Sequence, residues 1–112
     1  MVEENFTDIE QMVEDWLIKH KIPYQSQVSL RGGAFELGGS KIDFIIEGNI
    51  CLRIQGSYWH SGVEKIGRDA VQRELLESDG WIIVDLWEDI IKDPARFDQA
   101  MRLAIQGEEM PH

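Results

Sequence analysis

The hydrophobic positions near the N-terminus repeat with the period of an α-helix. Apolar residues recur three and four positions apart, at Ile9, Met12, Val13, Trp16 and Leu17. This spacing places them along one side of a helix. Thr7 is a good N-cap residue, and Glu10 completes a capping box three residues later. We therefore expect an amphipathic helix that begins at Thr7 and ends at residues 22–24.

The middle of the chain has the shorter patterns of β-strands. Apolar positions roughly alternate over residues 24–30, and residues 41–46 and 49–55 are mostly apolar. The turn sequence at residues 47–49 predicts that the last two segments form a hairpin. Between them and the first strand, the glycines of residues 32–39 indicate a turn-rich loop.

The second half of the chain predicts a helix, a strand and another helix. Residues 63–78 have a helical pattern, with Gly80 as the C-cap. Residues 81–86 form a short and almost wholly apolar stretch, as in a strand covered on both faces. Asp93 and Pro94 open the last helix as its N-cap and first residue. The expected order is α-β-β-β-α-β-α, a mixed α/β sheet flanked by helices in a single domain, residues 1–112.

One acidic residue interrupts the apolar pattern. Asp43 lies inside the stretch of residues 42–46, where burying a charge without a partner costs several kcal/mol. His60 follows just past the end of the next strand. A hairpin that sets these two groups close together predicts a site for metal binding and proton transfer.

The charge of the chain limits its partners. The formal net charge is −10, concentrated in residues 1–17 and from Asp85 onward, while residues 18–84 are nearly neutral. This charge argues against a tight DNA binder that acts alone, because phosphate binding needs a basic surface. We expect no signal peptide and no membrane span, which needs about 20 apolar residues. The single cysteine, Cys51, reads as a buried core residue and weakly favours a reducing cytoplasm.

The order of these landmarks resembles the restriction-endonuclease-like superfamily of PD-(D/E)xK nucleases. It is most similar to the very-short-patch repair (Vsr-like) endonucleases and their phage and homing-type relatives. Five landmarks, in order, carry the resemblance: Thr7-Asp8-Ile9-Glu10, Ser40-Lys41-Ile42-Asp43-Phe44, Gln55-Gly56-Ser57-Tyr58-Trp59-His60, Arg68-Asp69 and Gly80-Trp81 to Leu86-Trp87-Glu88. None of them is specific alone, but together they make a combined signal, and the match runs from about Thr7 to Glu88, most of the chain.

The resemblance implies a nuclease that uses Mg²⁺ or Mn²⁺. Asp43 would be the direct metal ligand, with the main-chain carbonyl of Ile54 as a second ligand and Glu10 holding metal-bound water. His60 would act as the general base or position the attacking water, since imidazole titrates near neutral pH. Asp69 would orient His60.

The resemblance also implies substrate contacts, and it has departures. Tyr58 and Trp59 occupy the position from which aromatic side chains wedge into stacked DNA bases. A strict PD-(D/E)xK site would have a carboxylate at Arg53 and a lysine at Gln55. Arg53 would either bind the scissile phosphate or repel the metal, and Gln55 is a further predicted substrate-binding residue.

Two functions from different classes therefore stay open. The first is a small DNA endonuclease or nickase that acts on phosphodiester bonds in the cytoplasm of a bacterial or phage-infected cell, as a homodimer or with a DNA-binding partner. The second is an inactive nuclease fold that binds protein or DNA. A third hypothesis is an acidic decoy that binds a DNA-binding protein. Each site residue also has a structural explanation: Glu10 as a capping residue, Asp43 paired with Lys41 or Arg53, and the aromatic residues as core.

Overall fold

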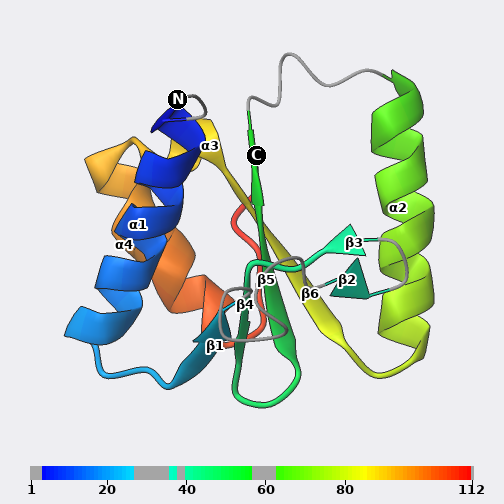
Figure 1. The fold of residues 1–112 in the computed structure, drawn as a ribbon, viewed down its shortest axis with the longest axis horizontal. Helices are drawn as coiled ribbons and strands as arrows, with labels where there is room; N and C mark the ends of the chain where they lie inside the picture. Colours follow the sequence, from blue (N-terminus) through cyan, green and yellow to red (C-terminus); the bar gives the residue numbers. More distant parts are fainter. Residues whose placement is uncertain (1–3, 27–35, 38–39, 57–62, 112) are drawn as a thin grey trace.

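The computed structural model describes residues 4–26, 36–37, 40–56 and 63–111, without the side chains of residues 4–7, 36–37, 40–41, 63–66, 68–69 and 72. Its elements follow one another as α1 (Glu4–Lys19), β1 (Tyr24–Ser26), β2 (Glu36–Leu37), β3 (Ser40–Lys41), β4 (Phe44–Ile46), β5 (Ile50–Gln55), α2 (Val63–Ser78), β6 (Ile82–Trp87), α3 (Glu88–Ile91) and α4 (Pro94–Ala104) (Figure 1). Among these elements, no helix is long and apolar enough to cross a membrane.

Four strands form a mixed sheet in the order β1-β4-β5-β6. Strands β1 and β4 are antiparallel, and so are β4 and β5, where Ile46 pairs with Ile50 across the predicted hairpin. Glu47 and Gly48 make that turn with positive φ angles of 54° and 84°. Strand β6 runs parallel to β5. A parallel neighbour needs a crossover connection, and α2 provides it.

Helices cover both faces of this sheet (Figure 1). Helices α1, α3 and α4 lie on one face and α2 lies on the other. Side chains alternate along β5, so that Ile50, Leu52 and Ile54 pack against the first group of helices, whereas Cys51 packs with Leu76 of α2. A strand buried on both faces explains why this part of the sequence is an almost continuous apolar run.

Most predicted elements are confirmed, with differences at their ends. Helix α1 begins at Glu4, so Thr7 lies inside it and the predicted capping box is wrong. The structure divides the predicted strand over residues 41–46 into β3 and β4, separated by Ile42 and Asp43. The small β2–β3 hairpin and the one-turn helix α3 were not predicted. Such short elements have too few residues for a periodic pattern to appear.

Candidate functional site

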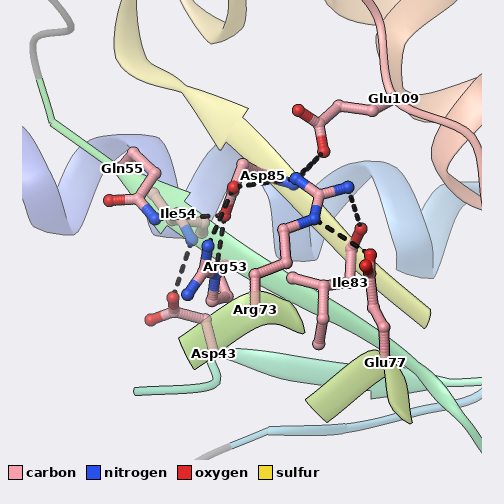
Figure 2. Close-up of polar contacts among 9 residues, drawn as sticks. All are labelled: Asp43, Arg53, Ile54, Gln55, Arg73, Glu77, Ile83, Asp85 and Glu109. Atoms are coloured by element: carbon pink, nitrogen blue, oxygen red, sulfur yellow. Dashed lines mark hydrogen bonds and ion pairs between the residues drawn. The ribbon is translucent and has the colours of Figure 1, made fainter. Parts of the chain in front are cut away.

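Asp43 lies at the break between β3 and β4, where its carboxylate binds the main chain of β5. The side chain is buried, and its Oδ2 accepts a hydrogen bond of 2.8 Å from the Ile54 N–H (Figure 2). The Asp43 N–H donates to the Leu52 carbonyl at 3.0 Å. A hydrogen bond to a charged carboxylate offsets part of the cost of burying it. The interruption of the strand therefore serves to bring a carboxylate against the end of β5.

Arg53 forms a buried ion pair with Asp85, a residue of β6. The two residues are partners in the parallel register of β5 and β6. Arg53 Nε lies 2.7 Å from Asp85 Oδ1, and Nη2 lies 2.9 Å from Oδ2, so the pair is bidentate (Figure 2). Their side chains are 5% and 10% exposed, so solvent screens the pair little. Asp85 is thus the acid that clamps Arg53.

The same carboxylate also holds two other side chains. Gln55 Nε2 donates to Asp85 Oδ1 at 3.1 Å, and Arg73 Nη1 of α2 donates to Oδ2 at 3.2 Å. Because the amide nitrogen of Gln55 faces Asp85, the amide oxygen of Gln55 points away from that residue (Figure 2). Asp85 therefore connects two of the predicted substrate-binding residues, Arg53 and Gln55, to helix α2.

Arg73 joins the C-terminal segment to this cluster. Its Nη1 lies 2.7 Å from Glu109 Oε1, its Nε lies 3.0 Å from Glu77 Oε2, and its Nη2 donates to the Ile83 carbonyl. Burial lowers the pKa of Arg73, but hydrogen bonds and charges from these carboxylates outweigh that effect and raise it. Two guanidinium groups thus meet three carboxylates, and the cluster has no excess positive charge.

Glu109 also protects the edge of the sheet. Strand β6 is the last strand in the order, and its Asp85 N–H donates to Glu109 Oε1 at 3.1 Å. A main-chain donor that has no partner among the described strands is thereby satisfied. We call Arg53, Gln55, Arg73, Glu77, Asp85 and Glu109 the charged cluster.

The structure brings together some of the predicted site residues. Asp43 meets Ile54 directly, and Arg53 and Gln55 meet through Asp85. Glu10 is half-buried on α1. Residues 57–62, with Tyr58, Trp59 and His60, lie outside the described residues, and Asp69 is described only as part of the α2 backbone. The roles predicted for these residues stay predictions.

Four members of the charged cluster escaped the sequence analysis: Arg73, Glu77, Asp85 and Glu109. Asp85 gives the same signal as Asp43, an acid within an apolar strand, but the apolar residues around it predict only a core strand. Its partner Arg53 is 32 residues away in sequence. Only the register of β5 against β6 shows that they meet.

The oxygen donors at Asp43 suit a hard divalent cation. Mg²⁺ binds through one or two carboxylates and keeps several of its waters, so one carboxylate beside main-chain oxygens is sufficient. Within the described ranges, no three His, Cys, Asp or Glu side chains gather closely enough to form a metal site by themselves. The chemistry of the Asp43 carboxylate therefore fits the predicted role of metal ligand, whereas the role of the Ile54 carbonyl stays a prediction.

Comparisons with known proteins identify the fold. No protein-family model matches this sequence, and no curated protein matches it either. The solved structure of the homing endonuclease I-Bth0305I catalytic domain superposes with a TM-score of 0.66 at 19% sequence identity, covering 86% of this chain and 91% of that one. The chain has the fold of that nuclease catalytic domain.

Proposed function

We propose that this protein is a small DNA endonuclease or nickase that depends on Mg²⁺ or Mn²⁺. The observation that carries the proposal is the position of Asp43. A buried carboxylate interrupts a strand and lies 2.8 Å from the main chain of the neighbouring strand, in a fold shared with an endonuclease catalytic domain. We assign the protein to the Vsr-like branch, as a phage-encoded or homing-type enzyme, because its landmarks follow the order of that branch.

The proposed roles follow from the chemistry of each side chain. Asp43 and the Ile54 carbonyl hold the cation, which supplies charge stabilisation to the phosphate when bound. Glu10 orients water, and the capping box that competed with this role is absent because α1 begins at Glu4. His60 takes the proton of the attacking water, and Asp69 holds the imidazole in place.

The substrate contacts have to overcome the acidity of the chain. With a net charge of −10, the protein as a whole repels DNA. Tyr58 and Trp59 contribute stacking, which does not depend on charge. We therefore propose that a second copy or a DNA-binding partner delivers the domain to DNA, in the cytoplasm of a bacterial or phage-infected cell.

Plasmid cleavage tests the proposal. We expect supercoiled DNA to be nicked or linearised at low salt with Mg²⁺ or Mn²⁺. Asp43→Ala and His60→Ala should each abolish the reaction, whereas Asp79→Asn, at an exposed position after α2, should cleave like the wild type. Circular dichroism checks that each variant is folded. A folded wild type that leaves the plasmid intact with both metals would contradict the proposal.

A second candidate is a nuclease fold that binds DNA or protein without cutting. The arginine at position 53 favours it, because a strict PD-(D/E)xK site has a carboxylate there, and so does the net charge. This reading predicts metal-independent binding with no cleavage. Binding to a labelled duplex in the presence of a chelator, compared with cleavage in Mn²⁺, separates the two functions.

A further inference from the structure

Arg53 is the residue that the proposed activity explains least. The N–H that binds Asp43 belongs to the peptide bond between Arg53 and Ile54, at 2.8 Å from the carboxylate. Standard covalent geometry then places the Arg53 Cα within roughly 5 Å of Asp43 Oδ2. A positive charge attached at this point disfavours a cation at Asp43, and the effect is larger in a buried site than in water.

Asp85 neutralises the positive charge of the Arg53 guanidinium by direct contact. It accepts Arg53 Nε at 2.7 Å and Nη2 at 2.9 Å, which fixes the plane of the guanidinium as well as neutralising it. Figure 2 shows this clamp between the end of β5 and the neighbouring strand β6, with Asp43 on the other side of the Ile54 N–H.

The position of Asp85 is itself fixed by the charged cluster. Arg73 contacts Asp85 Oδ2 at 3.2 Å, and Glu109 contacts both Arg73 at 2.7 Å and the Asp85 N–H at 3.1 Å. Helix α2 and the C-terminal segment thus hold the carboxylate that holds Arg53. A stability role alone does not require so many contacts on one acid, since buried ion pairs stabilise little compared with apolar packing.

We infer that Asp85 is a positioning residue of the metal site, which clamps and neutralises Arg53 so that Asp43 can bind a divalent cation. This inference rests on the proposed function, because it presupposes a metal at Asp43. It explains how a guanidinium can replace a carboxylate at position 53 without disabling the site.

Direct Mn²⁺ titration of the full chain, without DNA, tests the inference. The dissociation constant is measured by isothermal titration calorimetry for the wild type, Asp85→Asn, Arg53→Gln and the double variant. We expect Asp85→Asn to bind Mn²⁺ about tenfold or more weakly, from the added positive charge in a buried site. The double variant should return to within about threefold of the wild type, because the guanidinium is removed together with its partner.

Asp79→Asn is the matched control, since it changes the net charge equally at an exposed position. It should bind Mn²⁺ like the wild type, and thermal unfolding confirms that the variants are folded. If Asp85→Asn does not fold, Arg53→Gln decides, because removing the guanidinium while Asp85 remains should tighten Mn²⁺ binding severalfold. Unchanged or weaker binding by Arg53→Gln would overturn the inference.

The remaining outcomes separate the two proposals. A wild type that binds no Mn²⁺ overturns the metal-dependent function, and the inference with it. A wild type that binds Mn²⁺, with Asp85→Asn binding equally well, overturns the inference alone. Equal weakening in Asp85→Asn and in the double variant also overturns it, because the effect would then not pass through Arg53.

Discussion

Strands β5 and β6 have two faces with opposite chemistry. Toward α1, α3 and α4 they present Ile50, Leu52, Ile54 and other apolar side chains, and no charged residue belongs to that described core. Toward α2, the apolar packing of Cys51 and Ile83 gives way to Arg53 and Asp85 two residues further along each strand. The change from apolar to charged side chains thus occurs along one face of the same two strands.

This difference separates stability from the proposed function. Apolar burial is roughly additive and tolerates changes of detail, so the face toward α1 can stabilise the domain without a specific geometry. A buried ion pair contributes little to stability and requires its partner groups in fixed places. The charged cluster is therefore the part of the sheet whose arrangement we attribute to function.

The largest expected effect is on the apolar face. Leu52→Ala should lower the free energy of unfolding by about 4 kcal/mol, because a fully buried leucine is replaced by a cavity. Urea denaturation followed by circular dichroism measures the loss. Val71→Ala, at a side chain that is 58% exposed on α2, is the control and should change it by less than about 0.5 kcal/mol. Equal losses would contradict the assignment of the core to this face.

On the face toward α2, Arg53→Met should lower the free energy of unfolding by about 2 kcal/mol. It leaves Asp85 without its bidentate partner, although Arg73 still contacts that carboxylate at 3.2 Å and limits the loss. Replacing both partners, in Arg53→Met with Asp85→Leu, should restore the free energy of unfolding to within about 1 kcal/mol of the wild type, because buried pairs exchange for apolar groups at little cost.

The double variant is the decisive member of this set. If it stays as unstable as the single variant, the ion pair is a necessary part of the core and the contrast between the two faces fails. The same urea titrations provide the comparison.

The sequence predicted the apolar face better than the charged one. The stripe on α1, the turn at residues 47–49 and the apolar run of β5 are local patterns. The turn and the run are confirmed, and so is the stripe apart from Met12, which is 36% exposed. Each depends only on residues near one another in the chain, so a period or a turn motif is enough to recognise it.

The charged cluster depends on contacts between distant segments. Arg53 meets Asp85 through a parallel register, and Arg73 meets Glu109 across 36 residues of sequence. No periodicity contains that information. The predicted pairing of Asp43 with Ile54 came instead from the resemblance to nucleases, and the structure joins them through the Ile54 N–H.

A single hydrogen bond at the border of the apolar core should have a smaller effect. The Tyr24 hydroxyl of β1 donates to Glu14 Oε2 of α1 at 2.5 Å. This hydrogen bond, with burial and the acidic charges nearby, raises the pKa of Tyr24 from 10.0 to about 12. Tyr24→Phe should lower the free energy of unfolding by about 1 kcal/mol at neutral pH.

The difference in unfolding free energy between the wild type and Tyr24→Phe should depend on pH, because the pKa of Tyr24 is shifted on folding. The pKa is higher in the folded state, so the contribution is complete below pH 10 and is lost as the pH rises toward 12. Urea titrations of the wild type and Tyr24→Phe between pH 8 and about 12 measure it. A difference that stayed constant over this range would contradict the role assigned to the hydrogen bond between Tyr24 and Glu14.

The smallest expected effect comes from an ion pair with the same shortest distance but in an exposed environment. Arg102 Nε lies 2.7 Å from Asp98 Oδ2 on α4, the same distance as in the pair of Arg53 and Asp85, but its side chains are 60% and 51% exposed. Water and salt screen such a pair, so Arg102→Ala should change the free energy of unfolding by less than about 0.5 kcal/mol. We expect even that difference to shrink in 1 M NaCl, where charges are screened over roughly 3 Å. A loss as large as that of Arg53→Met would show that distance, and not burial, sets the strength of ion pairs in this protein, and the special position of the charged cluster would then disappear.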